Sequence, residues 1–213
     1  MNETVKPRRR YDASSRQAQA AVRRDAILEA ARSLLLTRGY ADTSLPDVAA
    51  AAGVSPETIY KSIGAKPALV KAVWQRSLEG RQPTPAPTRS DALSDTALDA
   101  PSLLRAWGEL TAEVSPLVAP LVLLIREAAA HDSDMRALLT EIEQERRERM
   151  RHNARKLLKR HEHRSGIGLE TATDILWTYS SPDLYELLVV KSHWSINRYA
   201  TFVTDAMIAA LIG

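Results

Sequence analysis

The sequence predicts an all-α protein, with an N-terminal three-helix helix-turn-helix domain followed by a larger C-terminal helical domain. Two observations predict this class. Apolar residues recur at spacings of three and four through most of the chain, which is the period of an amphipathic helix. The segment SLPDVAAAAGVSPETIYK, residues 44–61, also contains start and stop signals for two short helices. With 213 residues, 45% of them hydrophobic, the chain is long enough for one or two globular domains, and it has no cysteine for disulfides or thiolate metal sites.

The start and stop signals in residues 44–61 are side chains that cap helix ends and a glycine that permits a tight turn. Ser44 is expected to cap the first helix, because its hydroxyl can accept from a free N–H of the first turn, and Pro46 stands where a missing N–H is not needed. Gly53 is expected to supply the turn, and Ser55 repeats the start signal for a second helix that ends near Lys61. Two short helices at a steep angle are the arrangement that inserts a helix into the DNA major groove.

The second helix of the pair is expected to face base edges, with Ile59 turned into the domain. Its polar side chains offer hydroxyl, phenol and ammonium groups for bases and phosphates. Glu57 either accepts from a cytosine amino group or only caps the helix. The predicted DNA-contacting residues are Arg23, Arg24, Thr43, Ser44, Ser55, Glu57, Thr58, Tyr60, Lys61 and Lys66. A plain helical hairpin with solvated polar residues is the alternative.

Positive charge is concentrated at this end of the chain. Residues 1–80 contain 13 Lys+Arg against 8 Asp+Glu, a net of +5, and residues 81–213 contain 16 against 18, a net of −2. Residues 1–15 are expected to be a basic disordered arm attracted to phosphates, or else a solubilising tail. Residues 16–65 then form the helix-turn-helix domain, whose first helix runs to Arg38. A connecting helix, residues 66–80, starts at Lys66, which suits a phosphate there.

The segment ILEAARSLLLTRGYADTSLPDVAAAAGVSPETIYKSIGAKPALVKAVW, residues 27–74, resembles the N-terminal DNA-binding domain of the TetR family of transcriptional regulators. The shared features are the G-Y after the first helix, the T-S before the second, the A-G-V-S turn, the T-I-Y of the recognition helix and the K-x-x-L that opens the fourth. Ile63, where members usually carry Phe, and Pro67 depart from the family pattern.

Residues 81–100 contain Pro83, Pro85 and Pro87 and are expected to be a linker or long surface loop. Residues 101–213 are expected to form a helical regulatory and dimerisation domain. Helices are predicted over residues 101–114, 116–131, 133–160 and 171–179, with a last helix from Ile196. The longest apolar run, Leu117 to Ile125, is shorter than the roughly 18 residues of a membrane span, and no secretory leader is recognised, so a cytoplasmic protein is expected.

An apolar pocket for a small molecule is expected in the second domain. Its predicted lining is Trp107, Leu110, Leu121, Leu124, Ile125, Leu139, Ile142 and Trp177, although any one of these can instead be ordinary core. No cofactor and no metal are expected: His161, Glu162 and His163 are metal-ligand types, but the remaining histidines lie far off in the sequence. No G-x-S-x-G elbow, phosphate loop or H-E-x-x-H motif indicates an enzyme.

The last forty residues are similar to the C-terminal region of a TetR subgroup in which two helices pair with their symmetry mates. The predicted dimer interface is Leu184, Leu188, Tyr199, Val203, Met207 and Ala210; a monomer with two ordinary core helices is the alternative. The resemblance implies a homodimer that binds near-palindromic double-stranded DNA, usually as a repressor released by a small-molecule inducer. A helical protein-interaction module, or a ligand-binding protein without specific DNA recognition, is the other function left open.

Overall fold

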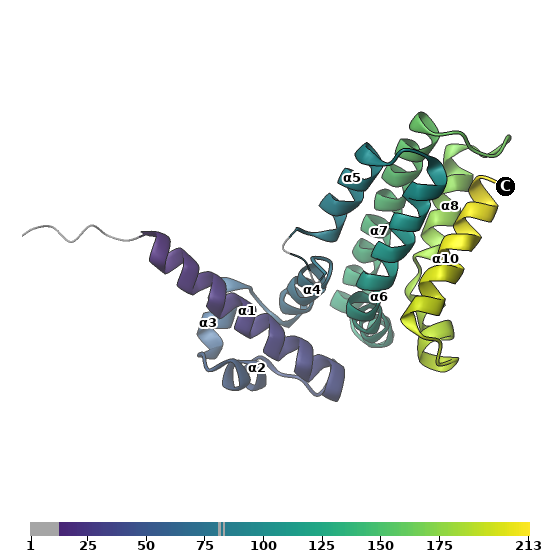
Figure 1. Cartoon of the computed structure of the whole chain (residues 1–213). Coiled ribbons are helices and arrows are strands. Elements are labelled where there is room, and N and C mark those ends of the chain that lie inside the picture. Colours follow the sequence, from purple (N-terminus) through teal and green to yellow (C-terminus); the bar gives the residue numbers. More distant parts are fainter. Residues whose placement is uncertain (1–12, 81, 83) are drawn as a thin grey trace, which may run out of the picture.

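The structure is a computed structural model that describes residues 13–80, 82 and 84–213, and within these residues every regular element is helical. The all-α prediction is confirmed. In Figure 1, α1, α2 and α3 form a group at one end of the molecule, α6, α7, α8 and α10 run alongside one another, and α4 lies between the two groups. The elements are α1 (Ala13–Arg38), α2 (Leu45–Ala52), α3 (Pro56–Ser62), α4 (Lys66–Ser77), α5 (Ala86–Thr96), α6 (Ala100–Ala129), α7 (Ser133–Arg160), α8 (Leu169–Tyr179), α9 (Pro182–Tyr185), the π-helix η1 (Glu186–Lys191) and α10 (Ile196–Leu211).

The N-terminal helices share one core with the larger domain. The apolar stripe of α1, which includes Ile27 and Leu35, packs with Ile59 of α3, as predicted, and with residues of α4. The same cluster of buried side chains continues without a break to Leu121 and Ile125 of α6 and to residues of α7. A side chain that moves in α6 or α7 therefore has packed neighbours that lead to the helix-turn-helix.

Helix α6 corrects the prediction of two helices separated at Ser115. It is continuous over 30 residues, with Pro116 and Pro120 inside it. A proline has no N–H to donate to the carbonyl oxygen four residues earlier, and its ring pushes against the preceding turn. Hydrogen bonds to the carbonyl oxygens of that turn are therefore weakened or lost. Arg32 of α1 meets this turn: its Nη1 donates to the carbonyl oxygen of Leu117 at 2.7 Å and to Oγ of Ser77 at 3.0 Å. Arg32 thus joins α1, α4 and α6 through one guanidinium.

By length and composition alone, α6 could also cross a membrane, which the shorter run of residues 117–125 did not reveal. Such a helix is equally the apolar core helix of a helical domain. In this fold α6 packs against α5, α7 and α10, and Leu103, Leu104 and Leu121 on it are fully buried. We therefore describe α6 as a core helix.

The prediction of a linker over residues 81–100 is wrong for most of that range, because α5 occupies it. Pro85 is the residue before the helix and Pro87 lies in its first turn, where backbone N–H groups have no helical partner, so these prolines do not oppose the helix. Ion pairs attach α5 to its neighbours. Arg89 binds Glu113 of α6 through two contacts of 2.8 Å, and Asp91 accepts from Arg149 of α7 at 2.9 and 3.1 Å.

Helix α10 packs closely on α6, and this corrects half of the predicted dimer interface. Tyr199, Val203 and Met207 are at most 4% exposed and contact the chain's own core, so they are not a free surface. Leu184, Leu188 and Ala210 are half-buried. The close packing depends on Gly108 of α6, because a Cβ there would lie 2.0 Å from Oγ1 and 3.2 Å from Cβ of Thr204.

Candidate nucleic-acid interface and ligand cavity

Local capping fixes the helix-turn-helix where the sequence predicted it. The hydroxyl of Ser44 accepts from the backbone N–H of Asp47, and the Asp47 carboxylate accepts from the N–H of Ser44 at 3.0 Å, so the two residues form a capping box. Gly53 ends α2 with a φ of +66°, a conformation that glycine adopts without strain. Ser55 caps α3 by accepting from the N–H of Thr58 at 3.3 Å.

The outer face of α3 is polar and accessible. Ile59 is fully buried against α1 and α2, whereas Tyr60 is 64% exposed and Glu57 and Lys61 are also exposed. Thr58 is half-buried, and its hydroxyl lies 3.1 Å from that of Ser55. The pKa of the Glu57 carboxyl is lowered by hydrogen bonds from its own backbone N–H and from the Ser55 hydroxyl.

Two predicted DNA contacts, Thr43 and Lys66, make contacts within the protein. Thr43 is only 3% exposed, and its hydroxyl donates to the carbonyl oxygen of Gly39 at 2.8 Å, so its side chain stabilises the α1–α2 turn. The ammonium of Lys66 lies 4.0 Å from the centre of the Tyr40 ring, and burial lowers its pKa. Lys66 begins α4 as predicted, but its charge is held against Tyr40.

The basic side chains of α1 lie near α3. Arg23 and Arg24 are exposed, and Nη1 of Arg24 donates to the carbonyl oxygen of Ser62 at the end of α3, at 3.3 Å. The helix begins at Ala13, three residues earlier than predicted, so the last part of the expected arm is helical. The remainder of that arm, residues 1–12, lies outside the described residues.

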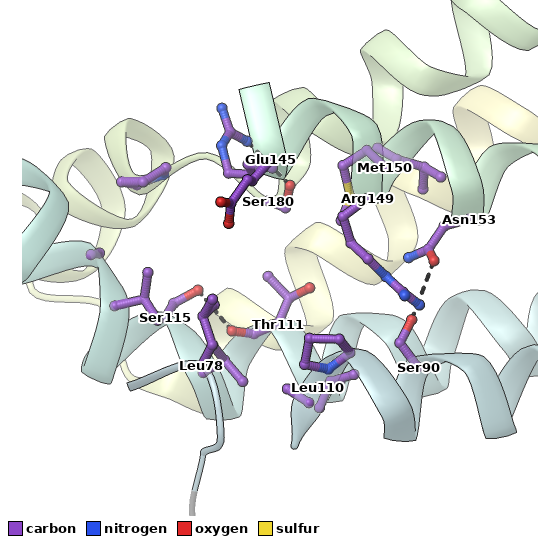
Figure 2. Close-up of a pocket in the computed structure, with 18 of the residues that line it drawn as sticks. Leu78, Ser90, Leu110, Thr111, Ser115, Glu145, Arg149, Met150, Asn153 and Ser180 are labelled. Carbon is purple, nitrogen blue, oxygen red and sulfur yellow. Dashed lines mark hydrogen bonds between the residues drawn. The ribbon is translucent and has the colours of Figure 1, made fainter. Parts of the chain in front are cut away.

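A cavity of about 340 Å³ lies in the larger domain, with walls from α4, α5, α6, α7, α8 and α10. Figure 2 shows Leu110 and Thr111 on one side of it and Met150 and Asn153 of α7 on another. Of the predicted lining residues, Trp107, Leu110 and Ile142 do line it. The others do not: Leu121 and Ile125 are buried in the core shared with α1, Leu124 and Leu139 pack against that core, and Trp177 stacks on Arg146.

The sequence analysis missed the polar part of the cavity, which comes mainly from α5 and α7. Ser90 of α5 donates to Oδ1 of Asn153 at 3.4 Å (Figure 2). The indole N–H of Trp107 donates to the carbonyl oxygen of Ser90 at 3.5 Å. Arg149 also lines the cavity while it holds Asp91, whose pKa it keeps far below the usual range by hydrogen bonding. These residues were missed because residues 81–100, where α5 lies, were expected to be a linker or surface loop.

Arg146 is the most buried charge at the cavity. Its Nη1 donates to the carbonyl oxygen of Trp177 at 2.6 Å, its Nη2 pairs with Glu143 at 3.0 Å, and its guanidinium lies 4.7 Å from the Trp177 ring centre. Burial lowers the pKa of Arg146 despite the Glu143 charge. The Arg-rich segment thus contributes an oriented guanidinium to the cavity wall.

Helix α4 belongs to both sites. Leu69 and Val70 on it are buried in the core with α1 and α3, whereas Trp74 and Leu78, further along, line the cavity. Trp74 is 3% exposed, and its indole N–H has no hydrogen-bond acceptor among the described residues. A molecule in the cavity would therefore touch the helix that packs on the helix-turn-helix.

Comparison with known proteins agrees with this geometry. The sequence model of the family described as "Bacterial regulatory proteins, tetR family" matches residues 27–73. The HTH-type transcriptional regulator AlkX of Mycobacterium tuberculosis is 46% identical over 55 residues, which are 26% of this chain and 26% of AlkX. The likeness to AlkX therefore spans about a quarter of that protein.

The whole chain resembles solved structures. NalD of Pseudomonas aeruginosa, the secondary repressor of the MexAB-OprM multidrug efflux pump, has a TM-score of 0.68 and 20% identity over 91% of this chain and 97% of NalD. The SmeT–triclosan complex has a TM-score of 0.71 and 18% identity over 90% of this chain and 92% of SmeT. At these identities the likeness establishes the fold alone, which this chain shares with NalD and SmeT. The sequence likeness to the tetR family of bacterial regulatory proteins is carried by residues 27–73.

Proposed function

We propose that this protein is a cytoplasmic transcriptional repressor that binds a near-palindromic DNA operator as a homodimer and is released by a small molecule. In this proposal α3 enters the major groove, α1 lies along the phosphate backbone, and the cavity between α4 and α8 takes the inducer. It involves no cofactor and no metal.

The exposed face of α3 supports the DNA-binding part. Tyr60 and Lys61 are free to approach a base edge or a phosphate, and Arg24 stands beside the end of α3, where a second phosphate would pass. Ser44 and Ser55 cap the N-termini of α2 and α3, where the positive ends of these helices lie.

The regulatory part of the proposal rests on one observation: α4 contributes residues both to the cavity and to the core of the helix-turn-helix domain. Trp74 and Leu78 line the cavity, and Leu69 and Val70 pack in the core of the helix-turn-helix. A ligand that fits one position of α4 better than another changes the separation of the two recognition helices. Operator affinity then changes by the difference in ligand-binding free energy between the two positions, on the order of 1–3 kcal/mol.

For the homodimer we propose a surface different from the residues predicted from sequence. Leu187 and Val190 of η1 are 54% and 51% exposed, and Phe202 of α10 is 39% exposed. An apolar surface formed by these three side chains is available for a second copy, whereas Tyr199 and Val203 are already buried in this chain.

Selection of bound sites from random duplexes, followed by fluorescence anisotropy at several salt concentrations, tests the proposal. We expect near-palindromic sites with half-sites about 34–36 Å apart and an affinity that falls steeply with salt. Tyr60→Ala and Lys61→Ala should weaken binding to the selected site. Lys159→Ala removes an exposed charge at the far end of α7 and serves as the matched control. Selection of no duplex, or equal binding by all variants, would overturn the assignment of α3.

A further inference from the structure

We propose that the cavity binds an apolar molecule that carries one hydrogen-bond acceptor oxygen, a carbonyl or a carboxylate, and that the indole N–H of Trp74 binds this oxygen. The inference rests on the proposed function only in taking the cavity as the inducer site. It adds the chemical class of the inducer and the residue that detects it.

The first argument is the unpartnered indole of Trp74. A buried N–H without an acceptor loses the hydrogen bond it had with water, at a cost of about 1–3 kcal/mol, so such groups are rare in folded proteins. Trp107, on another wall of the same cavity, does have an acceptor in the carbonyl oxygen of Ser90. Trp74 is as buried as Trp107 yet has none among the described residues. An acceptor oxygen in the cavity would satisfy it.

The guanidinium groups of Arg146 and Arg149 at the cavity also each have one N–H without an acceptor among the described residues. The Nη atoms of Arg146 are bound by Glu143 and the carbonyl oxygen of Trp177, and those of Arg149 are bound by Asp91. The Nε of each of these arginines is buried and has no acceptor among the described residues. The cavity wall thus lacks acceptors at three N–H groups, all of them donors.

The carboxylates of the wall do not create an equal demand for a cation. Glu143 is already paired with Arg146 at 3.0 Å, and Glu145 is exposed, so water solvates its charge. Figure 2 shows Glu145 and Ser180 on the side of the cavity opposite Leu78. An ammonium ligand would leave the three N–H groups unsatisfied, so the balance of polar groups favours an acceptor.

The rest of the wall determines the apolar body of the molecule. Leu110, Val122, Met150, Leu176 and Met207 give the cavity an aliphatic lining, and about 340 Å³ is within the range of small-molecule sites. Because Trp74 is on α4, a bond between the acceptor and Trp74 acts directly on the helix that packs against α1.

The test uses three probes of equal chain length: octanoate, 2-octanone and octylammonium. Binding to the full-length protein is measured by isothermal titration calorimetry, and DNA binding is measured separately by anisotropy. We expect octanoate and 2-octanone to bind more tightly than octylammonium. Comparison of the first two shows whether the oxygen is carried by an anion or by a neutral carbonyl.

Trp74→Phe should weaken octanoate and 2-octanone about tenfold, a typical effect for one hydrogen bond, while octylammonium changes little. Trp194→Phe is the matched control, since Trp194 is not among the lining residues of the cavity and stacks on Arg198 instead. Tightest binding by octylammonium, equal losses for all probes, or no binding of any probe would overturn this inference. Because DNA binding is measured apart from the probes, its absence would instead overturn the proposed function.

Discussion

The close contact between α6 and α10 at Gly108 predicts that Gly108→Ala lowers the free energy of unfolding. Gly108→Ala places a Cβ 2.0 Å from Oγ1, 3.2 Å from Cβ and 3.4 Å from Cα of Thr204. The hydroxyl can rotate away about χ1, which removes the closest contact. The contacts with Cβ and Cα remain, because these atoms move only when the α10 backbone moves.

Two effects of opposite sign then compete. Alanine is a better helix former than glycine, by about 1 kcal/mol in a helix interior. Overpacking of a tight helix–helix contact costs about 1–3 kcal/mol. The packing cost exceeds the propensity gain, so we expect a net loss of about 1 kcal/mol in the free energy of unfolding. For a chain of this length the melting temperature would fall by roughly 2–4 °C.

The assay is urea unfolding followed by circular dichroism, at one fixed protomer concentration because a dimer's stability depends on concentration. Thr204→Ala is measured alone and together with Gly108→Ala. In the Thr204→Ala background Oγ1 is gone but Cβ and Cα remain, so Gly108→Ala should still destabilise the protein, by less than in the native background. A gain of about 1 kcal/mol from Gly108→Ala in the otherwise native protein would refute the close contact.

Three further predictions follow. Ser44→Ala removes the cap of α2 and should cost about 1 kcal/mol of stability, measured by urea unfolding; an unchanged midpoint would contradict the capping box. Asp91→Asn should destabilise the protein at pH 7, because the pKa of Asp91 is lowered in the folded state. Such a carboxylate stabilises fully above its unfolded pKa of about 3.9, and the contribution is lost progressively as the pH falls from there towards the much lower folded pKa, so the difference in unfolding free energy between variant and native protein should shrink steadily below about pH 4; a constant difference would contradict this. Val190→Glu puts a charge on the exposed apolar surface and should abolish dimers in sedimentation velocity, and dimers that persist would exclude this surface.

The helix-turn-helix could be predicted in detail because its signals are local. Ser44, Gly53 and Ser55 act on backbone groups within three or four residues, so neighbouring sequence contains all the partners. The long helix α7 was also predicted with its observed bounds, since a cap at Asp132 and a regular apolar stripe mark it. The side-chain directions of Thr43 and Lys66 were not predictable in this way, because each depends on a contact with the α1–α2 connection.

Prolines caused the main errors in the larger domain. They were interpreted as breaks at residues 83–87 and at Pro116, yet Pro85 and Pro87 only begin α5 and Pro116 lies inside α6. Whether a proline ends a helix depends on the tertiary packing around it, and here Arg32, more than eighty residues away, binds the carbonyl oxygen of Leu117, between the two prolines.

The periodicity of the sequence also predicted which face of a helix is apolar, but it did not predict what that face packs against. Tyr199, Val203 and Met207 form an apolar stripe of α10, as the spacing indicates. Period alone does not distinguish packing against the same chain from packing against a second copy, and the structure assigns this stripe to the chain itself. The lining of the cavity was missed for a similar reason, since Ser90 and Arg149 meet only after α5 has folded onto α7.

The bridge made by Arg32 affects how the two halves of the protein move relative to each other. Apolar contacts are non-directional, so two packed apolar surfaces can shift slightly against each other with little loss of free energy. A guanidinium that donates at 2.7 Å to a main-chain oxygen and at 3.0 Å to a hydroxyl on a different helix tolerates little displacement before either bond is broken. We therefore expect α1 and α4 to move relative to α6 between two discrete positions, one with the Arg32 hydrogen bonds formed and one with them broken. A continuous displacement between these positions is disfavoured.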